Sequence, residues 1–297
     1  MNLIKPKKLK IGDTIEIIAT SGEVDFEKIQ KGAEYFQNKG FKIKFGKNIK
    51  KSFRYMAGTD SERLEDLQNA FLDKDIDAII CARGGYGAIR LVDKIDYSII
   101  HNNPKIFCGY SDITALSAMF LTKANLITFS GPMLQSDFSN KANLDKFTEK
   151  SFFETAENNK CEIKPNNLMT YKNGKAEGIL WGGNLATIVS LCGQDFIPDT
   201  NFIFFAEDLN EPVYKIDKYF QQLLNIKNFR ENVQGIILGD FLDVDNSMWL
   251  DELFKEIAQE LNIPTLGGYP ISHSSKKATI PYGGYAKVEN GIISVEY

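Results

Sequence analysis

Short apolar runs and amphipathic segments alternate along the first half of the sequence. Runs rich in β-branched and aromatic residues predict strands over residues 14–20, 41–45, 76–82, 106–108 and 124–129. Apolar residues at helical spacing predict helices over 25–39, 60–72 and 88–92, and another after residue 112 that runs through 121. Strands that alternate with helices at this spacing favour a mainly parallel sheet with helices on both faces.

The second half repeats this alternation after a polar stretch that is rich in Asn, Lys and Glu. It restarts at residues 177–185, from which a helix continues to residue 192. Apolar runs then predict strands over 202–206, 235–239 and 263–266, helices over 216–224 and 250–261, and a closing hairpin over 284–296. We therefore predict an N-terminal α/β domain over 1–150, an interdomain linker over 151–175 and a smaller mixed α/β domain over 176–297.

Composition narrows the kinds of partner. The chain has 297 residues, of which 43% are hydrophobic and 25% charged, and its formal net charge is -4. This balance gives no reason to expect nucleic acid or a membrane surface as a partner. The first ten residues lack the apolar core of a signal peptide, and four scattered cysteines form no C-x-x-C pair. We expect a cytoplasmic protein with reduced thiols.

Metal and cofactor sites have little support in the sequence. With only two histidines and no His/Cys cluster, a metal site is not expected. Gly85-Tyr86-Gly87 supplies the G-x-G of a dinucleotide fingerprint, but Arg90 stands where the third glycine belongs, so we expect no cofactor. These glycines either let the backbone approach a reacting carbonyl and donate an N–H to it, or they form a tight turn with no ligand.

Ser111 stands at a turn between a predicted strand and a predicted helix. Serine hydrolases place their nucleophile at such a turn, which exposes the hydroxyl and directs helix N-terminal amides beside it. The usual G-x-S-x-G pattern is broken by Ile113. On this pattern alone, Ser111 or Asp112 could equally serve to cap the helix.

A nucleophilic serine needs a base and a carboxylate to orient that base. His101 lies in a predicted surface loop, whereas His273 lies in a loop of turn-forming residues after a predicted strand and is the better candidate. Glu207 follows the apolar strand 202–206 directly, but spacing does not separate it from Asp208 and Glu211.

Several segments together resemble the LD-carboxypeptidases, a family of serine peptidases that includes muramoyl-tetrapeptide carboxypeptidases and microcin C self-immunity peptidases. The resemblance covers nearly the whole chain and is carried by residues 57–63, 77–88, 109–116, 130–132, 181–185, 205–208 and 268–273. Two departures are Ser272, where the family usually has glycine before its histidine, and the loop over 274–278.

The resemblance implies a Ser–His–Glu triad of Ser111, His273 and Glu207. It also implies that the backbone N–H groups of Gly85 and Asp112 form an oxyanion hole. The N-terminal domain would carry the serine, and the C-terminal domain the other two triad residues.

The function implied is release of the C-terminal D-alanine from muropeptide tetrapeptides during cell-wall recycling, with a small peptide as substrate. A microcin-immunity-like peptidase that cleaves aminoacyl-nucleotide amides and a non-catalytic muropeptide-binding protein are the alternatives. Candidate substrate-binding residues are Arg83, Tyr86, Trp181 and Asn184, although Trp181 could equally be a core residue. The sequence leaves open whether the chain forms a homodimer.

Overall fold

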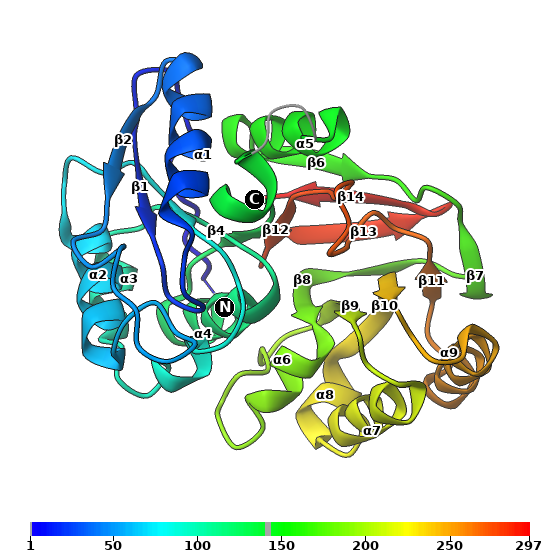
Figure 1. The fold of residues 1–297 in the computed structure, drawn as a ribbon. Coiled ribbons are helices and arrows are strands. Elements are labelled where there is room, and N and C mark those ends of the chain that lie inside the picture. The colour runs from blue at the N-terminus through cyan, green and yellow to red at the C-terminus, as the bar shows by residue number, and fades with distance from the viewer. Residues whose placement is uncertain (1, 140–143) are drawn as a thin grey trace.

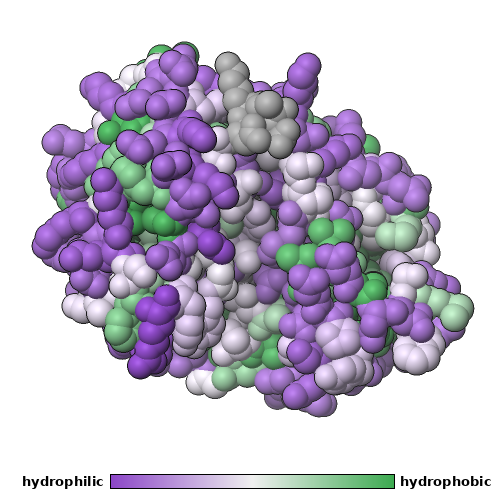
Figure 2. All heavy atoms as spheres, viewed as in Figure 1, coloured by the Kyte–Doolittle hydropathy of each residue, from purple (hydrophilic) through white to green (hydrophobic). Residues whose placement is uncertain are grey.

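Two β-sheets with helices packed against them make up the protein (Figure 1). The structure is a computed structural model and describes residues 2–139 and 144–297. It confirms the predicted α/β class and the division into two halves, each built on its own sheet. On the face drawn in Figure 2, hydrophilic residues predominate and apolar residues form small separate groups.

The N-terminal sheet has six strands in the order β12-β5-β4-β3-β1-β2. Their bounds are β1 Thr14–Ile18, β2 Lys42–Phe45, β3 Ala78–Cys81, β4 Ile106–Cys108, β5 Thr128–Ser130 and β12 Ile280–Tyr282. The first five strands pair in parallel, whereas β12 pairs antiparallel with β5. The sheet is therefore mainly parallel, as predicted, and the carboxyl ends of its parallel strands share one edge.

Helices cover both faces of this sheet. They are α1 Phe26–Asn38, α2 Asp60–Leu72, α3 Tyr97–Asn102, α4 Thr114–Ala124 and α5 Lys146–Glu157, with short turns η1 Ala88–Arg90, η2 Ser111–Ile113 and η3 Leu134–Phe138. Apolar residues of α1, η3 and α5 share one core with the sheet, and those of α2, α3 and α4 share the other. The expected helices over 25–39 and 60–72 begin at good caps, namely Asp25 and the capping box of Thr59.

The C-terminal sheet has eight strands in the order β6-β14-β13-β8-β9-β10-β11-β7. Their bounds are β6 Lys160–Ile163, β7 Met169–Lys172, β8 Ala176–Asn184, β9 Phe202–Leu209, β10 Val233–Leu242, β11 Thr265–Gly267, β13 Tyr285–Glu289 and β14 Ile292–Glu296. The strands β8 to β11 are parallel and the outer strands antiparallel, which gives the predicted mixed sheet. Its helices are α6 Leu185–Ser190, α7 Val213–Leu224, α8 Lys227–Asn232 and α9 Ser247–Leu261.

Two sequence predictions about connections are wrong. The predicted linker over 151–175 contains the end of α5 and the edge strands β6 and β7. Strands β6 and β7 were missed because their side chains are polar and largely exposed, and an edge strand with few apolar residues has the composition of a loop. His101 lies in the last turn of α3 rather than in a surface loop. No helix in the described residues is long and apolar enough to cross a bilayer.

The halves are also joined by strand β12, which the C-terminal half of the chain contributes to the N-terminal sheet. After β11 in the C-terminal sheet, the chain crosses to the N-terminal sheet as β12 and returns as β13 (Figure 1). The loop between β11 and β12 contains His273, so this crossing carries the candidate base from one sheet toward the other.

Candidate active site

Ser111 lies at the carboxyl end of β4 and begins the turn that leads into α4. Its φ of +63° places a non-glycine residue in the left-handed region, a conformation that costs about 1–2 kcal/mol. Strain of this kind is typical of nucleophiles held at a sharp turn. Ile113, which breaks the usual elbow pattern, is fully buried, and a Cβ on Gly109 would lie 2.9 Å from its side chain.

The glycine-rich turn after β3 packs directly against Ser111. A Cβ on Gly84 would lie 3.0 Å from the Ser111 Oγ and 3.6 Å from the backbone nitrogen of Asp112, so only glycine lets the two turns approach this closely. The backbone N–H of Ala88 donates to Asp112 Oδ2 at 2.9 Å. Burial raises the pKa of Asp112, and this hydrogen bond partly offsets the effect.

His273 and Glu207 form a short hydrogen bond in the opposite half of the protein. The Nδ1 of His273 lies 2.6 Å from Glu207 Oε2, and the two side chains are only 15% and 5% exposed. Burial alone lowers the pKa of His273. The hydrogen bond and the negative charge of Glu207 outweigh burial, so this pKa lies above its ordinary value. This contact leaves Nε2 as the ring nitrogen that can accept a proton.

Contacts between the halves bring the serine turn and the His–Glu pair together. The ring of Tyr110, next to Ser111, meets the imidazole of His273 edge-on with centroids 5.1 Å apart. The backbone N–H of Asn184 donates to Thr114 Oγ1, in the first turn of α4, at 3.3 Å. Asn184 is also the register partner of Glu207 between β8 and β9. Ser111, His273 and Glu207 therefore lie around one junction.

A buried ion pair between Lys277 and Asp137 packs against Tyr110. The side chains of Lys277 and Asp137 are 4% and 5% exposed and form an ion pair, and the Lys277 Nζ also lies 3.4 Å from the Tyr110 hydroxyl. The same ammonium lies 4.6 Å from the centroid of the Tyr110 ring, where it forms a cation–π contact. Sequence reasoning missed these residues, because a lysine in a polar loop is normally exposed.

The other candidate acids, Asp208 and Glu211, and the other candidate base, His101, contact groups outside the proposed triad. Asp208 accepts hydrogen bonds from the Asn184 side chain at 3.0 Å and the Ala186 backbone at 2.9 Å. Burial raises its pKa to about 6. Glu211 pairs with Lys215 at 3.1 Å, and His101 Nδ1 lies 3.0 Å from the carbonyl oxygen of Ala124.

A groove of about 690 Å³ lies beside the glycine-rich turn and is lined by Arg83, Gly85 and Tyr86 among others. Tyr86 is half exposed and its ring lies edge-on to that of Tyr55, with centroids 5.6 Å apart. The guanidinium of Arg83 donates to the Glu23 carbonyl oxygen at 3.1 Å and remains partly exposed. Three of the residues expected near the substrate are thus gathered in one groove.

The other two predicted substrate-binding residues lie in different surroundings. Trp181 is fully buried in the C-terminal core, where its ring packs against Phe196, Phe202, Phe204 and Phe229. Its burial corrects the prediction that it contacts the substrate. Asn184 is 8% exposed, and its side chain caps α6 and bonds Asp208, so it lies beside Glu207 as a structural contact. No group of three His, Cys, Asp or Glu residues suited to a metal occurs within 2–139 and 144–297.

Comparisons with known proteins give the family. Models of the LD-carboxypeptidase N-terminal and C-terminal domains match residues 15–131 and 177–288. The chain belongs to the LD-carboxypeptidase family. A relative named probable murein peptide carboxypeptidase, from Bacillus subtilis (strain 168), is 36% identical over 291 residues that cover 95% of this chain and 90% of that protein.

Solved structures with the same fold include an MccF-like protein from Bacillus anthracis str. Ames. It matches with a TM-score of 0.90 and 28% identity, over 99% of both chains. The microcin C7 self-immunity protein MccF, in complex with aspartyl sulfamoyl adenosine, matches with a TM-score of 0.89 and 29% identity, over 98% of both chains. The family model and several relatives are named carboxypeptidases. The protein is therefore a serine-type carboxypeptidase.

Proposed function

We propose that the protein is an LD-carboxypeptidase that releases the C-terminal D-alanine from muropeptide tetrapeptides, with Ser111, His273 and Glu207 as its triad. The observation that carries the proposal is the 2.6 Å contact between Glu207 and His273, which meets the Ser111 turn through Tyr110. Relatives named murein peptide and murein tetrapeptide carboxypeptidase support the substrate class.

The proposed reaction is an acyl transfer in two steps. The Ser111 Oγ attacks the carbonyl carbon before the terminal D-alanine, while His273 Nε2 takes the hydroxyl proton. The C–N bond then breaks, and the same proton passes to the leaving amine of D-alanine. In the second step His273 removes a proton from water, whose oxygen attacks the acyl carbonyl carbon. The ester C–O bond then breaks, and the proton passes from His273 to the Ser111 Oγ, which frees the shortened peptide and restores the enzyme. Glu207 holds the imidazole through Nδ1 and stabilises its cationic form throughout.

The developing oxyanion requires two N–H donors beside Ser111. Asp112 follows the serine at the start of a helix, and Gly85 follows the glycine that touches the Ser111 side chain. We assign the backbone N–H groups of these two residues to the oxyanion hole. Removing one such donor typically costs about 10²–10³-fold in rate.

The groove beside Gly85 is the proposed substrate site. The Arg83 guanidinium is suited to bind the terminal carboxylate of the peptide, since a planar fork of donors matches a carboxylate. Tyr86 would pack against the leaving residue. The substrate is a small peptide, so the proposal needs neither nucleic acid nor a membrane. Four free cysteines in the described structure fit a reducing compartment, and we place the reaction in cytoplasmic recycling of wall fragments.

A second candidate is hydrolysis of an aminoacyl-nucleotide amide. It is favoured by the structural match to MccF, whose solved complex holds aspartyl sulfamoyl adenosine. An aromatic surface that stacks on the base would favour this activity, but Trp181 lies in the core. Among the described residues that line the proposed groove, the aromatic side chains are the half-exposed pair Tyr55 and Tyr86.

Release of D-alanine from a diaminopimelate or lysine tetrapeptide, measured by chromatography, tests the proposal. We expect turnover by the wild type and loss of turnover in Ser111→Ala, with Ser117→Ala in α4 as the matched control. Wild-type turnover of aspartyl sulfamoyl adenosine alone would favour the second candidate. Binding of tetrapeptide without turnover of either compound would show a non-catalytic muropeptide-binding protein.

A further inference from the structure

The guanidinium of Arg63, in α2, lies buried behind the glycine-rich turn. Arg63 is 0% exposed. Its Nη1 donates to the carbonyl oxygen of Thr20 and, at 2.8 Å, to that of Gly87. Thr20 follows β1, and Gly87 ends the turn that follows β3. One nitrogen atom therefore links the two loops that approach the nucleophile from neighbouring strands.

The peptide group between Gly87 and Ala88 is held from both sides. Its carbonyl accepts from Arg63, and its N–H donates at 2.9 Å to the carboxylate of Asp112, the residue after Ser111. Consecutive hydrogen bonds to charged groups polarise one another and fix the plane of the peptide. Gly87 has φ +137°, and a Cβ there would lie 2.7 Å from Arg63 Nη1, so only glycine gives the guanidinium this approach.

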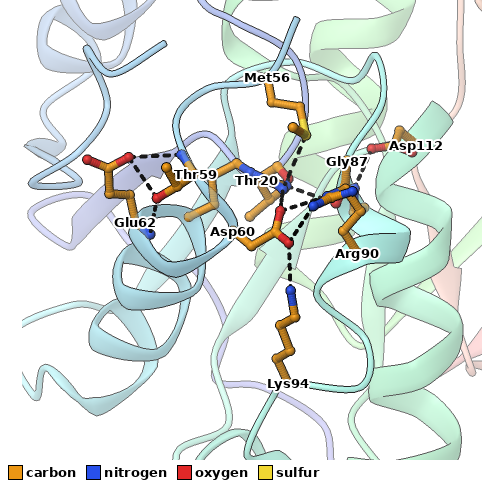
Figure 3. Close-up of polar contacts among 11 residues, drawn as sticks. Thr20, Met56, Thr59, Asp60, Glu62, Gly87, Arg90, Lys94 and Asp112 are labelled. Carbon is orange, nitrogen blue, oxygen red and sulfur yellow. Dashed lines mark hydrogen bonds and ion pairs between the residues drawn. The ribbon is translucent and has the colours of Figure 1, made fainter. Parts of the chain in front are cut away.

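Asp60 orients Arg63 in turn. The Arg63 Nη2 donates to Asp60 Oδ1 at 2.7 Å. The same carboxylate binds Arg90 at 2.8 Å and Lys94 at 2.6 Å (Figure 3). Hydrogen bonds from Arg90 and Lys94 hold the pKa of Asp60 well below its usual range. The Asp60 carboxylate stays ionised and holds the Nη2 of Arg63 in place. The Nη1 of Arg63 then reaches the carbonyl oxygens of Thr20 and Gly87.

We infer that Arg63 is a positioning residue for catalysis, because it fixes the glycine-rich turn against Asp112 and so sets the direction of the oxyanion-hole N–H groups. The inference rests on the oxyanion role proposed above for Gly85 and Asp112. Lysine at this position keeps the charge but lacks the planar fork that reaches a carboxylate and two carbonyls at once. Since oxyanion contacts tighten only in the transition state, their misalignment lowers kcat and leaves KM unchanged.

Lys105 offers a matched control. It is 7% exposed, and its Nζ also donates to two backbone carbonyl oxygens, those of Ala70 and Asp73. It precedes β4, whereas Ser111 follows that strand, so it lies at the opposite end from the nucleophile. Arg63→Met and Lys105→Met each remove one buried cation from backbone carbonyls, and Arg63→Lys serves if Arg63→Met does not fold.

The test combines kcat and KM on the tetrapeptide with melting temperature and amide hydrogen exchange of residues 83–90. We expect both Arg63 variants to lose about 10²-fold in kcat at constant KM and to exchange faster in this segment. Lys105→Met should lower only the melting temperature. Wild-type kcat or unchanged exchange in a folded Arg63→Lys protein would overturn the inference, as would an equal kcat loss in Lys105→Met. Failure of the proposed function shows separately, as absent turnover by the wild type, and the exchange measurement needs no substrate.

Discussion

In the proposed triad, the half around Ser111 (the nucleophile half) and the half around His273 and Glu207 (the base half) are held in place by different kinds of contact. Around Ser111 the contacts are largely those of the backbone: a left-handed residue, a glycine pressed against its side chain, and a peptide N–H bound to Asp112. Around His273 they are side-chain contacts, namely the bond to Glu207 and the ring of Tyr110. The half around Ser111 depends on the absence of a side chain at Gly84. The half around His273 depends on the side chains of Glu207 and Tyr110.

This difference determines how each half should respond to substitution. A side-chain pair is disrupted by an isosteric change that leaves the fold intact. A backbone arrangement does not tolerate added atoms, because close-packed turns have no free volume. Two substitutions and a titration separate the two cases, and a substitution in the core, outside both halves, serves as a reference.

Removing the charge of Glu207 should have the largest effect. In Glu207→Gln the amide no longer stabilises the imidazolium and also allows the wrong tautomer, so we expect kcat to fall about 10³–10⁴-fold. Steady-state release of D-alanine, with circular dichroism to check folding, measures this. Asp208→Asn is the neighbouring control and should lose much less, because Asp208 bonds Asn184 and α6 rather than the imidazole.

Adding one methyl group at Gly84 should have the next largest effect. The new Cβ would lie 2.9 Å from the Ser111 Cβ, so the turns must separate, and a displacement near 1 Å costs about 10²-fold in kcat. Gly235→Ala, near the start of β10, is the control for crowding, since its Cβ would lie 2.8 Å from that of Ala176 in β8. A Gly84→Ala enzyme with wild-type kcat would contradict a backbone-built nucleophile half.

The pH dependence of kcat/KM reports on the His–Glu pair. His273 must be neutral to take the serine proton, and its pKa is raised by Glu207 above the ordinary 6.5. Activity should therefore rise as pH increases through a midpoint above 6.5, and NMR titration of the His273 ring in Glu207→Gln should give a lower pKa. A midpoint below 6.5 in the wild type would show that burial outweighs the carboxylate.

Trp181→Phe should have the smallest effect on activity. The indole is surrounded by phenylalanine rings, and its Nε1 has no hydrogen-bond partner among the described residues, so the change removes packing but no polar contact. We expect the free energy of unfolding to drop by about 1–2 kcal/mol with unchanged kcat. Urea denaturation and turnover assays measure the two quantities, and a large rise in KM would return Trp181 to the substrate site.

Much of the fold followed from the sequence because its strong elements carry local signals. The apolar strands β1, β3 and β9 and the capped helices α1 and α2 appear where hydrophobic periodicity and caps predict them. The strands β6 and β7 escaped prediction because exposed edge strands lack the apolar runs that mark buried ones. The position of strand β12 in the sheet could not be predicted from the local sequence, because its partner β5 is distant along the chain.

The site was predictable to a different degree in each half. Ser111 stands out by its strand–turn–helix context, whereas the choice of Glu207 over its neighbours required the family resemblance. Trp181 was a misleading candidate because an indole suits both a ligand surface and a core. The contacts of Arg63 and Lys277 could not be predicted, although Arg63 lies in the family segment 57–63. Burial of a long cationic side chain depends on partners that are distant in sequence, namely Gly87 for Arg63 and Asp137 for Lys277.

The crossing of the chain from β11 to β12 makes the last residue of the proposed triad one of the last parts of the chain to be synthesised. Residues 1–272 contain the serine and the glutamate, but the histidine arrives only with the segment that adds β12 to the edge of the N-terminal sheet. A growing chain therefore leaves β5 without its neighbour β12, and Ser111 without His273, its proposed base, until this segment has been made.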